Sequence, residues 1–241
     1  MAALEIERLR FRYEDMQMEF DLQVESGEFL GVIGPSGAGK STLLSLIAGF
    51  ERAESGSIRV NSQEIAALPP NERPVTMLFQ DNNLFAHLTV EQNVGLGIHP
   101  GLRLTAEQRD AVAAALERVG LGGFAQRRPD QMSGGERQRT ALARSLVRNR
   151  PLLLLDEPFA ALGPALRREM LDLVDELRLA QGFTVLFVTH QPEDALHAAG
   201  RVAFIAEGRV AATGPARELL LHPSSAALRA YLGPDWLDDR G

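Results

Sequence analysis

An α/β fold with a parallel-sheet core is predicted by three patterns in the sequence. Residues 34–41 fit the phosphate-loop pattern G-x-x-x-x-G-K-[ST] and directly follow the apolar run 29–33. Two further apolar runs, 152–155 and 183–188, are continuous, as is typical of strands covered on both faces in a parallel sheet. A helical pattern separates these two runs, so the segment that contains them predicts a βαβ unit.

The N-terminal part of the chain shows a different pattern, in which apolar and polar residues alternate. Over residues 16–25 every second position is apolar, which predicts a strand with one buried side and one side facing solvent. Residues 58–60 continue the pattern, and a short strand is expected at 75–79 after a loop at 69–74. We therefore expect an antiparallel β subdomain at the N-terminus. Its buried side should include Met16, Met18, Phe20, Leu22 and Val24.

The middle of the chain, about residues 81–135, is expected to form an inserted α-helical subdomain. Residues 105–108 read Thr-Ala-Glu-Gln, a capping box that predicts a helix start. Gly120 lies where a helix commonly ends on glycine. The apolar face between these two signals consists of Val112, Leu116 and Val119.

In the last third, helical and strand patterns alternate. Pro164 and Gly182 mark the expected start and end of one helix. The apolar stripe of this helix consists of Leu166, Met170, Leu173, Val174 and Leu177. A strand at 202–205, a turn at 207–208 and a short helix are expected to follow. The pattern predicts a single domain over residues 1–233 and a polar C-terminal tail over 234–241.

Composition narrows the classes of protein. No stretch of the 241 residues approaches the ~18 consecutive apolar residues of a membrane span, and the first residues are acidic where a signal peptide is basic. We therefore expect a cytoplasmic protein. The absence of cysteine excludes disulfides and thiolate metal sites, and the five histidines show no metal-ligand spacing. A net charge of −7 argues against nucleic acid as a partner.

The phosphate loop predicts binding of a nucleoside triphosphate. Its glycines allow consecutive backbone N–H groups to surround phosphate oxygens, Lys40 reaches the β- and γ-phosphates, and Ser41 offers a hydroxyl to Mg²⁺. The helix at 42–48 points the positive end of its dipole at the anion. An ordinary glycine-rich turn is the alternative, which the strand before and the helix after disfavour. The expected nucleotide-binding residues are Gly34, Pro35, Ser36, Gly37, Ala38, Gly39, Lys40, Ser41 and Thr42.

Two acidic residues follow the apolar run 152–155, which places their carboxylates at the edge of an α/β sheet where ligands bind. Asp156 is expected to bind Mg²⁺ together with Ser41. Glu157 is expected to polarise an attacking water as the general base of phosphoryl transfer. The alternative is that both acids only cap the turn that follows.

Residues 132–136, Met-Ser-Gly-Gly-Glu, resemble the signature motif of ABC transporter ATPases, usually written LSGGQ. Taken alone, Ser133 and Glu136 are also a capping box, which other helices share. The order of motifs decides between these interpretations. The ABC family has a phosphate loop, a glutamine after a strand, the signature, an Asp-Glu pair and a histidine. This chain supplies Lys40, Gln80, Ser133, Asp156, Glu157 and His190 in that order.

The resemblance implies a P-loop NTPase that uses ATP and Mg²⁺, and it implies roles for further residues. Gln80 is expected to contact Mg²⁺ or the attacking water, and His190 the γ-phosphate. Tyr13 matches the aromatic residue that stacks on adenine; without the resemblance it is equally well a structural aromatic. In the family, two subunits enclose two ATP molecules, and each signature faces the other subunit's phosphate loop. The signature residues expected to bind nucleotide are Ser133, Gly134, Gly135 and Glu136.

The resemblance also implies partners and a location. A homodimer is expected to bind integral membrane permease subunits at the cytoplasmic face of the bacterial inner membrane, with a periplasmic solute-binding protein acting indirectly. The segments 77–80, 82–85 and 87–90 are most similar to ATP-binding subunits of bacterial thiamine and thiamine pyrophosphate importers. An ATPase for iron, sulfate or polyamines, an exporter or a soluble ABC ATPase is the alternative. The expected permease contacts are Phe85, Leu88 and Val90.

Two positions depart from the family pattern. Glu136 replaces the usual glutamine and adds an anion close to the phosphates. Gly163 replaces an aspartate that bridges the dimer interface in the family. As a helix start this second change is mild, because glycine costs only a few tenths of a kcal/mol relative to aspartate. Without this carboxylate the coupling between the two nucleotide sites is expected to be weaker. The alternative is unchanged coupling, if water-mediated contacts replace the carboxylate.

Overall fold

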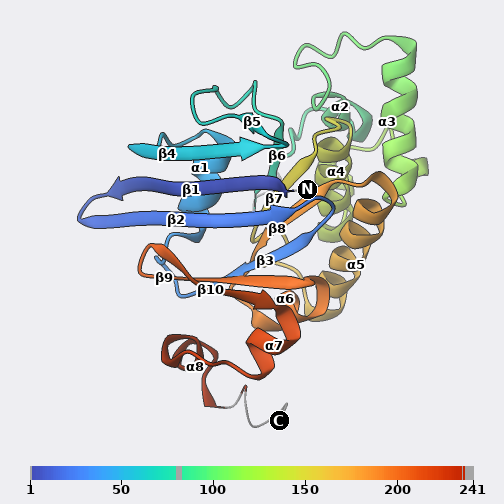
Figure 1. Cartoon of the computed structure of the whole chain (residues 1–241). Helices are drawn as coiled ribbons and strands as arrows, with labels where there is room; N and C mark the ends of the chain where they lie inside the picture. Colours follow the sequence, from blue (N-terminus) through green and yellow to red (C-terminus); the bar gives the residue numbers. More distant parts are fainter. Residues whose placement is uncertain (1, 80–82, 235, 237–241) are drawn as a thin grey trace.

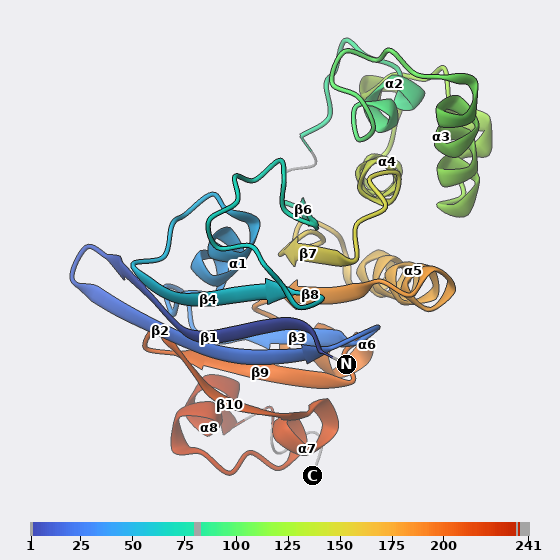
Figure 2. The ribbon, with the colours of Figure 1, turned by 45° about the horizontal axis from the view of Figure 1, so that its top comes forward.

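A ten-stranded sheet forms the centre of the computed structural model, which describes residues 2–79, 83–234 and 236. The strand order is β5-β4-β1-β2-β10-β9-β3-β8-β7-β6. Figures 1 and 2 show the sheet strongly curled, with most helices gathered beside its β6–β8 end. The strands are β1 Ala2–Tyr13, β2 Met16–Glu25, β3 Phe29–Ile33, β4 Ser55–Val60, β5 Gln63–Glu64, β6 Val75–Leu78, β7 Leu152–Asp156, β8 Thr184–Val188, β9 Arg201–Ala206 and β10 Arg209–Pro215.

The core of the sheet is parallel, as predicted, because β6, β7, β8, β3 and β9 pair side by side in one direction. Helix α5, Pro164–Gln181, connects β7 to its neighbour β8, which confirms the βαβ unit. The helix begins at its N-cap Gly163 and ends at Gly182, whose φ of 75° is the left-handed conformation that glycine adopts readily. Both faces of β7 are covered, because alternate leucines belong to different core clusters.

The N-terminal strands are antiparallel, as expected, with β1 between β2 and β4. Strand β10 joins the two parts of the sheet, because it pairs antiparallel with β9 and parallel with β2. The alternation in β2 is confirmed from Met18 to Val24, whereas the prediction that Met16 is buried is wrong. Met16 is 39% exposed because it lies beside the tight turn between β1 and β2, beyond the reach of the core.

Helix α1, Lys40–Ala48, packs on the concave side of the curled sheet. Its buried Leu43, Leu44 and Ile47 share one hydrophobic cluster with side chains of β1, β2 and β4. The second cluster lies on the opposite face, between the parallel strands and the later helices. Since apolar burial is the main favourable term in folding, the first cluster holds α1 against the sheet, and the second holds the later helices against the opposite face.

The three α-helices at 90–146 are α2 Val90–Gly95, α3 Ala106–Arg118 and α4 Gly134–Leu146. Of these, α2 and α3 stand away from the sheet in Figure 2, and α4 lies between them and the end of the sheet at β6. The capping box at 105–108 is confirmed: the Thr105 hydroxyl accepts from the backbone of Gln108, whose side chain accepts from Thr105. Gly120 has a φ of 72°, as expected just past a helix end.

Three short helices complete the C-terminal part. One short helix was predicted after the β9–β10 hairpin, whereas the structure has two there. The three helices are α6 Pro192–Ala198, before β9, and α7 Ala216–Leu221 and α8 Ala226–Leu232, after β10. The indole of Trp236, in the stretch predicted as a polar tail, is 6% exposed and donates to the carbonyl of Leu220 over 2.8 Å.

Among the helices of the described residues, none combines the length and the apolar character that a membrane span requires.

Arg73 is buried between α1 and the loop before β6, where its guanidinium donates to four backbone carbonyls. Two of these carbonyls, on Leu46 and Ile47, lie in the last turn of α1, where helices leave carbonyls unsatisfied. The other two belong to Ala66 and Leu68. Burial lowers the pKa of Arg73, while nearby Glu64 opposes this effect. The side chain therefore ties the far end of the phosphate-loop helix to the loop between β5 and β6.

Replacing Arg73 with Met should lower the free energy of unfolding by about 2–4 kcal/mol, because methionine fills similar space but leaves carbonyls buried without a donor. Urea unfolding followed by circular dichroism measures this change. The exposed Arg103 on the loop before α3 offers a matched control, and Arg103→Met should stay within about 0.5 kcal/mol of the native chain. Equal stability of the two variants would contradict the role given to Arg73.

Candidate functional site

The phosphate loop follows the carboxyl end of β3 and leads into α1, as its sequence predicts. Three of its glycines have positive φ: 150° at Gly34, 76° at Gly37 and 104° at Gly39. Gly34 is also constrained by space, because a Cβ there would lie 2.0 Å from the carbonyl oxygen of Ile205 on β9. Only glycine allows this close approach of two backbones.

Lys40 begins α1, and its ammonium group points back over the loop. It donates hydrogen bonds to the carbonyls of Gly34 and Pro35, each over 2.8 Å. Burial lowers the pKa of Lys40, whereas the charges of Glu157 and Asp156 oppose that shift. The site therefore holds a buried cation above a loop of glycines, an arrangement that suits phosphate oxygens.

Asp156 ends β7 beside the start of α1. Its carboxylate accepts a hydrogen bond from the hydroxyl of Ser41 over 3.0 Å. Burial raises the pKa of Asp156; Ser41 and Lys40 oppose the rise, and Glu157 adds to it. A hydroxyl and a carboxylate held together are oxygen ligands of the kind Mg²⁺ takes, so these two residues fit the predicted metal site. Among the described residues no group of three or more histidines and acids is arranged for a metal.

Glu157 and His190 lie together although 33 residues separate them in the sequence. The Glu157 carboxylate and Nδ1 of His190 are 2.9 Å apart, and since a carboxylate only accepts, Nδ1 carries the hydrogen of this bond. The φ of Glu157 is 47°, a left-handed conformation that is strained for glutamate. Its N–H donates to Val188 at the end of β8, which holds this conformation.

The signature segment forms the start of α4. The hydroxyl of Ser133 accepts from the backbone of Glu136, and the Glu136 carboxylate accepts from the backbone of Ser133 over 2.6 Å, so the capping box is present. These hydrogen bonds lower the pKa of Glu136. The carboxylate thus binds its own helix start. Gly135 packs against Leu166 of α5, and α4 lies apart from α1 in Figures 1 and 2.

The structure therefore brings together Lys40, Ser41, Asp156, Glu157 and His190, but it does not join them to the signature within one chain. Tyr13 is 58% exposed at the end of β1, so it is not a core aromatic. Gln80 lies outside the described residues. Gly163 is the exposed N-cap of α5 without a side-chain cap, and a Cβ there would meet nothing within 4 Å.

Several residues near the site were not predicted from the sequence. Arg167 and Asp194 form a buried ion pair of 3.3 Å between α5 and α6, and Arg167 also donates to the carbonyl of Leu162. Tyr231 of α8 donates to the carbonyl of His190 over 3.3 Å. Arginine and tyrosine at these positions belong to no motif, and long-range contacts of this kind leave no local signal.

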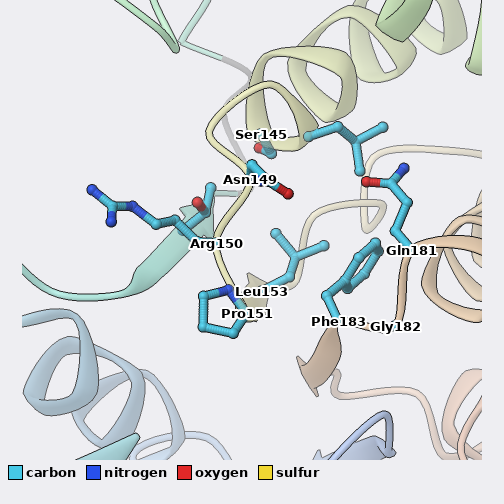
Figure 3. Close-up of a pocket in the computed structure, with 10 residues that line it drawn as sticks. Ser145, Asn149, Arg150, Pro151, Leu153, Gln181, Gly182 and Phe183 are labelled. Carbon is cyan, nitrogen blue, oxygen red and sulfur yellow. The ribbon is translucent and has the colours of Figure 1, made fainter. Parts of the chain in front are cut away.

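A cavity of about 230 Å³ lies at the other edge of the parallel strands, where β7 and β8 begin (Figure 3). The wall of this cavity is formed by residues around the N-terminal ends of β7 and β8. None of the predicted site residues lines the cavity. The residues that line it include Ser145, Asn149, Arg150, Pro151, Leu153, Gln181 and Phe183. The cavity is therefore separate from the phosphate loop.

Comparison with known proteins extends the motif evidence to most of the chain. A family model described as ABC transporter matches residues 18–160. The thiamine import ATP-binding protein ThiQ of Brucella suis is 57% identical over 232 residues, which make up 96% of each chain. The protein of the same name from Mesorhizobium japonicum is 54% identical and covers 95% of this chain and 90% of its own. The protein of this name from Yersinia pseudotuberculosis is 53% identical, and the match covers 95% of this chain and 97% of that protein.

Solved structures show the same architecture. The ADP conformation of an ATP-binding cassette of an ABC transporter matches with a TM-score of 0.88 and 25% identity, over 97% of this chain and 99% of that chain. The protein cbiO1 of Clostridium perfringens, part of an ABC transporter complex, matches with a TM-score of 0.83 and 29% identity. This match covers 92% of this chain and 91% of that chain. The predicted fold class is confirmed.

Proposed function

The chain belongs to the ABC transporter family and is an ATPase, and from this premise we propose that it powers the uptake of thiamine or thiamine pyrophosphate. It would act at the cytoplasmic face of the bacterial inner membrane, on a permease that receives solute from a periplasmic binding protein. The observation that carries the proposal is the cluster of Lys40, Glu157 and His190 at one sheet edge in a chain so similar to thiamine import ATPases.

In the proposed mechanism the phosphate loop binds the triphosphate of ATP through its backbone N–H groups, and Lys40 turns its ammonium from the loop carbonyls to the β- and γ-phosphates. Ser41 and Asp156 would hold Mg²⁺, which supplies positive charge to the phosphates when bound. Glu157 takes a proton from the water whose oxygen bonds to the γ-phosphorus, as the bond from that phosphorus to the bridging oxygen of ADP breaks. His190 orients the Glu157 carboxylate.

We further propose that two copies of the chain enclose two ATP molecules. The separation of α4 from α1 supports this arrangement, because the N–H groups at the start of α4 would meet a nucleotide bound by another copy. The Glu136 carboxylate would stay ionised there, because its hydrogen bonds with Ser133 favour the charged form, so its negative charge would act against the phosphates of that nucleotide. At Gly163 the proposed interface lacks the carboxylate that the family places there.

The permease is proposed to dock over three exposed aromatic side chains, Phe50 after α1, Phe79 after β6 and Phe85 before α2. Phe50 and Phe79 are 55% and 38% exposed, their ring centroids are 5.8 Å apart, and they line a groove of about 420 Å³ with Arg144 and Arg148. Phe85 is 49% exposed. A short cytoplasmic helix of the permease with apolar anchors fits this surface. Leu88 is half-buried, and Val90 is 0% exposed and so offers no surface, contrary to the contact predicted for it.

Glu157→Gln should stop hydrolysis while ATP binding persists. The amide keeps the shape of the side chain but cannot take the proton of water, so kcat should fall by about 100-fold or more. Steady-state ATPase assays measure kcat, and size-exclusion chromatography with Mg-ATP should show a stable dimer. Glu218→Gln, an exposed carboxylate on α7, is the matched control and should keep normal turnover. Normal turnover in Glu157→Gln would refute the assignment of the base.

Phe50→Glu and Phe85→Glu should each weaken co-purification with the permease, because each replaces an exposed aromatic anchor of the proposed docking surface with a charged side chain. Binding of ATP should not change, since neither ring touches the phosphate loop. Leu179, 68% exposed on α5, provides the control Leu179→Glu, which should assemble normally. If both phenylalanine variants also assemble normally, docking takes place elsewhere.

The transported solute is tested with the complete transporter reconstituted in liposomes together with its solute-binding protein. Thiamine or thiamine pyrophosphate should stimulate ATP hydrolysis, because the loaded binding protein favours the state of the permease that closes the two ATPase subunits. Comparing the two solutes identifies which is preferred. Stimulation by iron, sulfate or a polyamine instead would overturn the solute assignment without affecting the ATPase assignment.

A further inference from the structure

We propose that Tyr231, in the C-terminal helix α8, is a positioning residue for ATP hydrolysis. Its hydroxyl holds the backbone of His190 in place from the side of the C-terminal helix. Tyr231 touches neither nucleotide nor water in this proposal, and it acts through His190. The inference rests on the function proposed above, because it assumes that His190 orients the general base Glu157.

The phenol oxygen contacts the segment that carries His190. It donates a hydrogen bond to the carbonyl of His190 over 3.3 Å. Burial raises the pKa of the Tyr231 phenol, whereas the nearby backbone of Gly34 opposes the rise. The phenol is therefore protonated at neutral pH and keeps the hydrogen that it donates. A phenyl ring without the oxygen cannot make this hydrogen bond.

The position of this oxygen is set by the protein core. The ring of Tyr231 packs against Phe204 of β9, with centroids 5.6 Å apart and planes at 40°. The hydroxyl of Ser225 caps α8 by accepting from the backbone of Leu228, which is itself fully buried. In Figures 1 and 2, α8 lies below the β9–β10 hairpin, on the side away from α1. The C-terminal helix thus forms a support behind the site.

His190 requires such support because it follows the last residues of β8 and is exposed. Its side chain is 52% exposed, and its Nδ1 contacts the Glu157 carboxylate at 2.9 Å. The preceding residue is fixed, since the N–H of Thr189 donates to the carbonyl of Val32 on β3. Tyr231 fixes the carbonyl side of His190 in the same way. Holding a catalytic group in its reactive orientation contributes directly to the rate of the chemical step.

Tyr231→Phe in the full chain tests the proposal, because phenylalanine keeps the ring on Phe204 and removes only the oxygen. We expect kcat for ATP hydrolysis to fall about three- to tenfold, with KM for ATP within about twofold of the native value. The thermal unfolding midpoint should stay within about 2 °C. In spectra of the protein with ¹³C-labelled histidine, the ring signal of His190 should move, while that of His197, bonded to Asp172, should not.

Trp236→Phe is the matched control, because it removes a hydrogen bond of the same C-terminal segment, the one from the indole to the carbonyl of Leu220. It should keep the native kcat. The proposal is overturned if Tyr231→Phe hydrolyses ATP at the native rate, if only its KM rises, or if kcat falls equally in both variants, which would indicate a merely structural role.

Glu157→Gln, assayed in parallel, separates this proposal from the proposed function. If Glu157→Gln is inactive and Tyr231→Phe has the native kcat and histidine spectrum, only the role of Tyr231 fails. If Glu157→Gln hydrolyses ATP normally, the assignment of the base fails, and with it the reason for positioning His190.

Discussion

The register of three neighbouring parallel strands is the constraint on which the candidate site depends. Strand β3 leads into the phosphate loop, β7 ends in Asp156, and His190 follows β8, so that all three strands deliver their groups to one edge. Asp156 is paired with Val188, whose carbonyl also accepts from Glu157. Four buried leucines precede Asp156 in β7, so a slip of one residue would either draw the carboxylate into the apolar core or expose a leucine, and this fixes where the carboxylates lie.

The charges at this edge depend on one another. Burial acts against the charged forms of both Lys40 and Asp156, and each of these two groups stabilises the charge of the other. Glu157 adds a second negative charge, which favours the ammonium of Lys40 and opposes ionisation of Asp156. A bound metal cation between Ser41 and Asp156 would relieve this repulsion between carboxylates, which gives the proposed magnesium site an electrostatic reason as well as a geometric one.

Residues outside every motif hold the site in place from several directions. Arg73 satisfies the last carbonyls of α1, and Tyr231 contacts the segment of His190 from the C-terminal helix. The buried pair of Arg167 and Asp194 connects the start of α5 to α6, the helix just after His190. A buried pair of this kind is costly to break, because the remaining charge loses its partner in a medium of low polarity. The loops that carry the chemistry are thus constrained by the surrounding fold.

Features that depend on local spacing could be predicted from the sequence. They are the phosphate loop, the capping boxes at Thr105 and Ser133 and the βαβ unit around α5, because backbone conformation and helix periodicity are local properties. The folded structure was needed to show that Met16 is exposed, that Val90 is buried and that Tyr231 reaches His190, 41 residues away. These outcomes depend on which surfaces meet when the sheet curls and the helices pack on it, and no local pattern encodes that geometry.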